Sequence, residues 1–160
     1  MTDVSSVVRD VVRNAEHTLG GGGHRFVLDL PPEPLEAEAD LDKLRQIVAD
    51  LVENAVKYSP DGGTIAVSAR PTDDGIEVCV DDEGIGVPES ERALIFSKFY
   101  RADSDGRELA SGGTGLGLFI AKELLEAMRG RIWVRQREER GSSFVFVLPA
   151  AGEPILSERE

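Results

Sequence analysis

The sequence predicts an α+β protein of two layers, in which helices cover one face of a mixed, mostly antiparallel sheet. Two observations lead to this prediction. Apolar residues recur at helical spacing in three segments and alternate with other residues in five shorter ones. The alternating segments run mostly in hairpin-like pairs, which favours a mixed sheet with the helices collected on one of its faces.

The helical pattern occupies residues 4–19, 41–58 and 117–128. The second segment is the strongest, because its apolar residues follow the i, i+3, i+4, i+7 rule without a gap. These residues are Leu44, Ile47, Val48, Leu51, Val52, Ala55 and Val56. Asp40 precedes them and is the predicted N-cap, since its carboxylate can accept a hydrogen bond from an amide of the first turn.

The alternating pattern occupies residues 25–30, 64–70, 75–80, 131–137 and 143–148. A run of four glycines at 20–23 predicts a turn before the first strand, and Pro149 closes the last strand. We therefore divide the chain into an N-terminal helix and glycine-rich turn at 1–24, a domain at 25–149 and a loose tail at 150–160.

The composition excludes several classes of protein. With 160 residues, 41% of them apolar and 30% charged, the chain is long enough for one domain with a buried core. A formal net charge of -12 argues against nucleic acid as a main partner, and a phosphorylated ligand would need a cation and local donors. No apolar run is long enough to span a bilayer, Met1 is not followed by an export signal, and Cys79 is alone. We expect a cytoplasmic domain without direct membrane contact, even if a longer parent protein is anchored in the inner membrane.

Asp50, Asn54 and Lys57 lie at positions i, i+4 and i+7 of the strongest helix and share one polar stripe. An amide oxygen suits a hard cation, and the ammonium group of Lys suits a phosphate. Taken alone, the stripe is better explained as a solvated helix flank with an incidental charge pair.

Two glycine-rich strings follow. Residues 82–86 (DEGIG) come directly after a strand, where Asp82 can accept a hydrogen bond from an amine such as that of adenine, and the glycines allow close approach. Residues 112–117 (GGTGLG) run into the third helix, whose free amides and dipole favour an anion. Taken alone, each string also fits an ordinary turn or loop.

Together and in this order, the strings resemble the sequence boxes of bacterial sensor histidine kinases. Residues 46–60 are similar to the N box, 82–86 to the G1 box, 95–101 to the F box and 113–118 to the G2 box. The resemblance covers about residues 4–149 and is to the catalytic, ATP-binding domain (HATPase_c, GHKL superfamily). The wider superfamily includes gyrase, mismatch-repair and chaperone ATPases. The resemblance implies a Bergerat-type ATP-binding fold with a lid at about residues 101–113.

The resemblance also implies roles for individual residues, with ATP and Mg²⁺ as the ligands. Asp82 would bind the adenine amine, Ile85 would pack on the base, and Asn54 would coordinate Mg²⁺. The remaining expected contacts with the nucleotide are Lys57, Tyr58, Gly84, Gly86, Arg101, Gly113, Thr114, Gly115, Leu116 and Gly117. Phe96 and Phe99 are expected to anchor the lid to the core.

Asp50 departs from the family pattern, because histidine kinases usually have Asn at this position. In gyrase and chaperone relatives a carboxylate here is the general base that activates water. Asp50 is therefore expected either to support the metal site or to act as a catalytic base, and we favour metal or structural support.

No phosphoacceptor histidine is predicted in this chain, because neither His17 nor His24 occurs in a phosphoacceptor motif. Both histidines are expected at the surface. We expect a monomeric ATP-binding part of a longer kinase. Its partners would be the dimerisation and phosphoacceptor domain of that kinase and a response regulator. A serine kinase of the anti-sigma-factor type and a nucleotide-binding module without transferase activity remain as alternatives.

Overall fold

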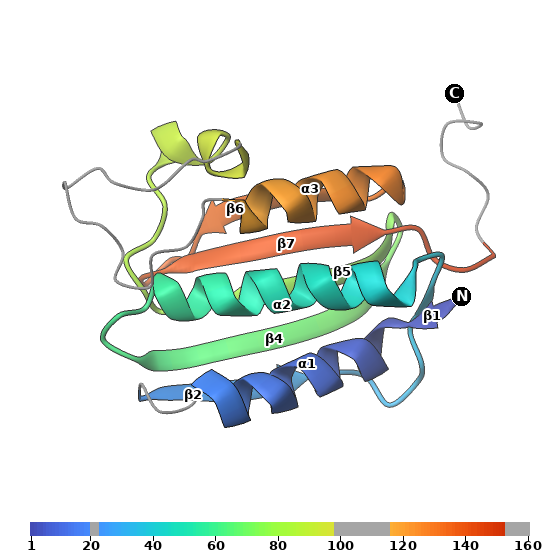
Figure 1. Cartoon of the computed structure of the whole chain (residues 1–160), viewed down its shortest axis with the longest axis horizontal. Coiled ribbons are helices and arrows are strands. Elements are labelled where there is room, and N and C mark those ends of the chain that lie inside the picture. The colour runs from blue at the N-terminus through green and yellow to red at the C-terminus, as the bar shows by residue number, and fades with distance from the viewer. Residues whose placement is uncertain (20–22, 98–115, 153–160) are drawn as a thin grey trace.

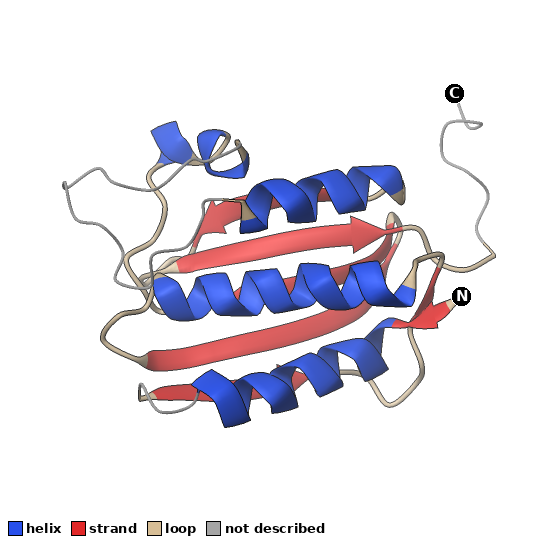
Figure 2. Ribbon diagram, viewed as in Figure 1, coloured by secondary structure: helices blue, strands red, loops and turns tan. Residues whose placement is uncertain are grey.

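The computed structural model describes residues 1–19, 23–97 and 116–152. Three helices lie against one face of a five-stranded sheet (Figures 1 and 2). The helices are α1 (Val4–Leu19), α2 (Leu41–Lys57) and α3 (Gly117–Ala127), with the short 3-10 turns η2 (Glu89–Glu91) and η3 (Leu94–Phe96). The strands are β1 (Thr2–Asp3), β2 (His24–Asp29), β3 (Glu36–Ala37), β4 (Gly63–Thr72), β5 (Gly75–Asp81), β6 (Arg131–Gln136) and β7 (Ser142–Leu148). The predicted α+β sandwich is confirmed.

The main sheet has the strand order β2-β4-β5-β7-β6. Strands β2 and β4 are parallel, because α2 lies between them in the chain and returns the backbone to the same end of the sheet. The other three pairs are antiparallel. This order places the start of β7 beside the end of β5, with Ser143 opposite Asp81.

A second sheet of only two strands, β1 and β3, was not predicted. Each strand has two residues, which is too short for an alternating pattern to be visible in the sequence. The chain after β7 joins this small sheet, since the amide of Ala151 donates to the carbonyl of Glu36 at 2.9 Å. Regular pairing therefore continues two residues beyond Pro149.

The core lies between the helices and the sheet, and α2 occupies its centre (Figure 1). Asp40 caps α2 as predicted, because its carboxylate accepts a hydrogen bond from the amide of Lys43 at 3.0 Å. The buried residues of this helix are Leu44, Ile47, Val48, Leu51, Val52 and Ala55. Helix α1 packs beside α2 and adds Val4, Val7, Val8, Val11, Val12 and Ala15 to the same core. The segment before residue 25 thus shares its core with the rest of the domain.

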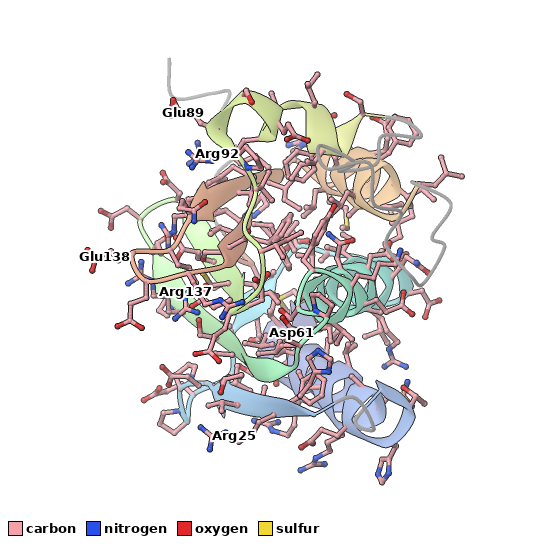
Figure 3. All side chains as sticks on the ribbon, turned by 90° about the vertical axis from the view of Figure 1, so that its left-hand side faces the viewer. Arg25, Asp61, Glu89, Arg92, Arg137 and Glu138 are labelled. Atoms are coloured by element: carbon pink, nitrogen blue, oxygen red, sulfur yellow. The ribbon has the colours of Figure 1, made fainter. Side chains whose placement is uncertain are left out.

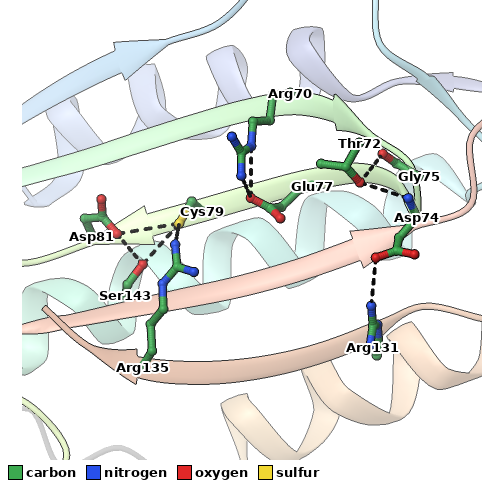
Figure 4. A network of polar contacts seen from close by, with 10 residues as sticks. All are labelled: Arg70, Thr72, Asp74, Gly75, Glu77, Cys79, Asp81, Arg131, Arg135 and Ser143. Atoms are coloured by element: carbon green, nitrogen blue, oxygen red, sulfur yellow. Dashed lines mark hydrogen bonds and ion pairs between the residues drawn. The ribbon is translucent and has the colours of Figure 1, made fainter.

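The opposite face of the sheet carries polar side chains (Figure 4). The hydroxyl of Ser143 donates to the carboxylate of Asp81 at 2.5 Å, and Cys79 lies 3.1 Å from the same hydroxyl. Arg135 approaches the thiol from β6 at 3.8 Å. Burial raises the pKa of Cys79, so this cysteine is a packed residue of the sheet rather than an ionised thiol.

No helix among the described residues is both long and apolar enough to cross a membrane.

Phe96, the first residue expected to anchor the lid, is buried and packs edge-on against Phe144 of β7, with ring centroids 6.4 Å apart. Phe99 lies outside the described residues.

Candidate functional site

The polar stripe of α2 lies at the edge of the core. The side chains of Asp50, Asn54 and Lys57 are all half-buried, as expected for the rim of an apolar face. Gln46, one turn before Asp50, donates to its carboxylate at 2.9 Å. Oδ2 of Asp50 and Nδ2 of Asn54 are buried, and neither has a hydrogen-bond partner among the residues that the structure describes. Two unpaired polar atoms four residues apart are unusual in a packed protein.

Burial dominates the electrostatics of this stripe. The pKa of Asp50 is raised from 3.8 to about 6, mainly by burial and also by the charge of Glu53. The hydrogen bond from Gln46 and the charge of Lys57 act in the opposite direction. The first residue of α3, Gly117, lies against this carboxylate, since a Cβ there would be 3.9 Å from Cγ of Asp50. The start of α3 and the polar stripe of α2 therefore form one surface.

Asp82 follows β5 and is fully buried. Its Oδ1 atom accepts hydrogen bonds from the amides of Gly84 at 2.9 Å and Ser142 at 3.1 Å. Its Oδ2 atom is buried and has no partner within the described parts of the chain. Burial raises the pKa of Asp82, while the two amides and the nearby Arg137 lower it and the charge of Asp81 raises it further. A buried acceptor held in place with one free oxygen is suited to a donor from a ligand.

The loop after Asp82 is docked on the end of α2. The carbonyl of Tyr58 accepts a hydrogen bond from the amide of Ile85 at 2.9 Å. A Cβ on Gly84 would lie 1.8 Å from the same carbonyl oxygen, so only glycine fits there. The side chain of Glu83 reaches the start of β4 and accepts from the amide of Thr64 at 2.7 Å. These contacts join the N-box and G1-box segments into one structure.

Ile85 and Gly86 of the same loop also belong to the described part of the site. Ile85 is 51% exposed although it is apolar, which leaves its side chain available for a flat ligand. Gly86 has a φ of +77°, a left-handed conformation that favours glycine. Tyr58 is buried, and burial together with the charges of Glu91 and Asp82 raises the pKa of its hydroxyl.

Four expected contacts, Arg101, Gly113, Thr114 and Gly115, lie outside the described residues, as does the expected lid at 101–113. Leu116 and Gly117 are described and form the start of α3. The described residues thus bring together the α2 stripe, the loop after β5 and the beginning of α3.

Several residues of the site were not predicted. The amide of Ser142 and the guanidinium of Arg137 both contact Asp82, the second through its backbone carbonyl at 2.9 Å. His24 was expected at the surface, but it is half-buried and its Nε2 lies 2.7 Å from the carbonyl of Ser59. These contacts involve backbone atoms of residues distant in sequence, which no local pattern reveals.

The residues present fit a purine nucleotide with a cation. Asp82 offers a free buried oxygen beside an exposed apolar side chain. Asp50 offers a carboxylate oxygen without a partner in the described structure, which suits a cation, and the unpaired amide nitrogen of Asn54 is a donor that suits a phosphate oxygen. Lys57 adds a positive charge next to them. Among the described residues no group of three or more acidic, His or Cys side chains is arranged to hold a metal alone.

Comparison with known proteins agrees with this geometry. Residues 39–152 match the family model of the histidine kinase-, DNA gyrase B- and HSP90-like ATPases. The chain is 40% identical over 126 residues to the sensor histidine kinase WalK of Bacillus subtilis (strain 168), covering 78% of this chain and 20% of WalK. It is 36% identical over 135 residues to the sensor protein kinase WalK of Staphylococcus aureus, covering 83% of this chain and 32% of that protein. The chain thus spans a fifth to a third of these relatives.

Solved structures give the same result. The mycobacterial sensor histidine kinase MprB superposes with a TM-score of 0.79 at 26% identity, covering 96% of this chain and 97% of that one. Full-length ShkA in complex with AMPPNP superposes with a TM-score of 0.80 at 30% identity, covering 96% of this chain and 31% of that one.

The chain belongs to the family of histidine kinase-, DNA gyrase B- and HSP90-like ATPases. Within this family, its sequence and fold are those of the ATP-binding catalytic domain of sensor histidine kinases. The resemblance inferred from the four boxes is confirmed, and neither the serine-kinase alternative nor the non-catalytic alternative is favoured.

Proposed function

We propose that this domain binds ATP with Mg²⁺ and donates the γ-phosphoryl group to a histidine on a separate dimerisation domain. The observation that most directly supports this proposal is the free Oδ2 of Asp82, which is buried and unpaired among the described residues. In the proposed complex it accepts a hydrogen bond from the exocyclic amine of adenine. Ile85 packs on the base, and Gly84 and Gly86 let the ligand approach the backbone.

The polar stripe of α2 would hold the phosphate end of the nucleotide. Asn54 supplies the protein ligand to Mg²⁺, Lys57 contacts phosphate oxygens, and Tyr58 lies near the nucleotide. The cation would neutralise phosphate charge, which a chain of net charge -12 cannot do through its overall field. Arg101 and the amides of residues 113–117 complete the phosphate contacts, with a lid at about 101–113.

The proposed reaction is an in-line transfer. The bond between the γ-phosphorus and the oxygen that bridges to the β-phosphate breaks, and a bond from phosphorus to a ring nitrogen of the acceptor histidine forms. ADP leaves, and the imidazole proton passes to solvent. Positioning and charge neutralisation provide most of the catalysis in such transfers. The phosphoryl group would then pass to a response regulator, and the isolated domain would be monomeric.

The test combines this chain, Mg²⁺ and γ-labelled ATP with the phosphoacceptor helices of the same kinase. We expect label on a histidine of the added helices, recognised because the phosphoramidate is lost in acid and kept in base. Acid-stable label on serine would contradict the proposal. The absence of any transfer despite measurable ATP binding would support a module that only binds nucleotide.

The role of Asp50 is tested separately. We propose that it supports the metal site rather than activating water, since its carboxylate is half-buried beside Asn54 and Lys57 on one helix face. Slow ATP hydrolysis by the wild type and Asp50→Asn is compared at saturating ATP and several Mg²⁺ concentrations. A rate that is equal at saturating Mg²⁺ but needs more Mg²⁺ in the variant supports metal binding, whereas loss of hydrolysis at every concentration indicates a general base.

A further inference from the structure

The β6–β7 hairpin provides most of the groups that hold Asp82. Ser142 makes two backbone contacts, because its carbonyl accepts from the amide of Asp82 at 2.9 Å and its amide donates to Oδ1 at 3.1 Å. Arg137 makes the third contact, from its guanidinium to the carbonyl of Asp82 at 2.9 Å. With the amide of Gly84 on Oδ1, these contacts leave Oδ2 as the only polar atom of Asp82 without a partner in the described structure.

The carbonyl of Asp82 is also confined sterically. Gly141 has a φ of +90°, and a Cβ there would lie 2.0 Å from this carbonyl oxygen. The amide of Arg137 donates to the carbonyl of Gly141 at 3.2 Å, so the backbone of the arginine is bonded to the glycine that lies against the carbonyl of Asp82. The carbonyl thus lies between a glycine that leaves it room and a guanidinium that binds it.

Arg137 differs from its neighbours in the hairpin turn. Its side chain is half-buried, whereas those of Glu138, Glu139 and Arg140 are exposed. In Figure 3, Arg137 lies inward beside the loop that leaves β5, and Glu138 points away from the body of the domain. Partial burial removes water from the guanidinium, and a hydrogen-bond acceptor of the protein must replace it. The carbonyl of Asp82 is this acceptor.

We propose that Arg137 is a positioning residue for adenine recognition, which fixes the backbone of Asp82 so that its free oxygen faces the amine of the base. This inference rests on the proposed function, in which Asp82 contacts adenine. Arg137 also favours the ionised form of the carboxylate against burial. Among the described residues, Arg137 lowers and Asp81 raises the pKa of Asp82, and the charge of Asp82 in turn raises the pKa of Tyr58. Removal of Arg137 therefore disturbs both the orientation and the charge of the acceptor.

The test measures dissociation constants of ATP and of ITP, which carries a carbonyl where ATP has the exocyclic amine. We expect the wild type to prefer ATP. Arg137→Gln should weaken ATP on the order of tenfold and ITP much less, so that the preference is largely lost. Arg137→Lys should restore most of it, because it keeps a charged donor. Arg140→Gln, in the same turn but exposed, is the matched control and should keep the wild-type preference.

The outcomes separate this inference from the function on which it rests. A wild type without any preference for ATP would contradict the adenine contact of Asp82 itself. A wild type with a preference that Arg137→Gln leaves intact would overturn only the role of Arg137, as would equal weakening of both nucleotides. If Arg137→Gln melts below the assay temperature, Arg137→Met repeats the measurement with the aliphatic stem kept, and the same criteria apply. The pH profile of ATP binding adds a second readout, since its acid limb should move to higher pH without Arg137.

Discussion

Gly84 and Tyr58 are in contact through their backbones, because the Cβ that any other residue would carry at position 84 falls 1.8 Å from the carbonyl oxygen of Tyr58. The same oxygen accepts a hydrogen bond from the amide of Ile85 at 2.9 Å. The G1-box loop therefore rests on the end of α2 without room for a side chain, and this contact fixes the two halves of the proposed nucleotide site relative to each other.

Gly84→Ala should consequently lower both stability and ATP affinity. The added methyl group must push the loop away from Tyr58 and break the hydrogen bond of Ile85, at a cost of roughly 2 kcal/mol or more. Thermal unfolding and ATP titration check this prediction. An alanine variant with wild-type melting temperature and affinity would show that the loop can move away from α2 without consequence.

Gly117→Ala is predicted to lower ATP affinity without lowering the stability of the fold. Among the residues that the structure describes, a Cβ at this position meets only atoms of Asp50, at 3.9 and 4.0 Å, which is ordinary contact, and alanine favours a helix. The free energy of unfolding should stay equal or rise by up to about 1 kcal/mol. ATP affinity should fall, because the methyl group enters the surface shared by α3 and the polar stripe of α2. Unchanged affinity would remove Gly117 from the phosphate contacts.

Asp50→Asn should stabilise the domain at neutral pH. The pKa of Asp50 is raised from 3.8 to about 6, so the folded protein holds this proton more tightly than the unfolded chain does. Its contribution to stability is therefore complete below pH 4 and is lost as the pH rises through 6. After allowance for solvent screening, the gain in the variant at pH 7 is roughly 1–2 kcal/mol.

Chemical denaturation at several pH values between 3.5 and 7.5 measures this effect. The difference between Asp50→Asn and the wild type should be small at the acid end and grow with pH. Asp61→Asn, which removes an exposed carboxylate just after α2, is the matched control. A constant difference at all pH values would mean that Asp50 ionises as easily in the folded as in the unfolded chain.

Asp82→Asn should fold but bind ATP poorly. The amide oxygen of Asn can accept the same two hydrogen bonds, from Gly84 and Ser142, that Oδ1 accepts now. The amide nitrogen then replaces the free oxygen, and a donor would face the adenine amine. We expect a loss of affinity on the order of a hundredfold with a melting temperature at least as high as that of the wild type. Calorimetric titration and thermal unfolding provide both values.

The fold was largely predictable because its elements have strong local patterns. Periodicity placed α2, and Asp40 marked its beginning, because a cap is a property of adjacent residues. The parallel pairing of β2 with β4 and the small sheet of β1 and β3 depend on contacts between distant segments. The first has no signature in either strand, and the second involves too few residues to form a pattern.

The residues proposed to contact the ligand were predictable from the sequence, whereas the residues that hold them in place were not. Asp82 and Asn54 were identified because their strings resemble those of a known family. Arg137 was not, because it binds a backbone carbonyl, and any residue at position 82 would present one. His24 was expected at the surface for a similar reason, since its contact is with the carbonyl of Ser59 rather than with a side chain.

The dependence of Asp82 on the β6–β7 hairpin has a consequence for the order in which the protein matures. Ser142 follows Asp82 by 60 residues, so the carboxylate leaves the ribosome long before the strand that orients it has been synthesised. A nascent chain therefore acquires the proposed adenine contact only after β7 has been translated. Products that terminate early, before β7, should contain every residue of the N and G1 boxes and still fail to recognise the base.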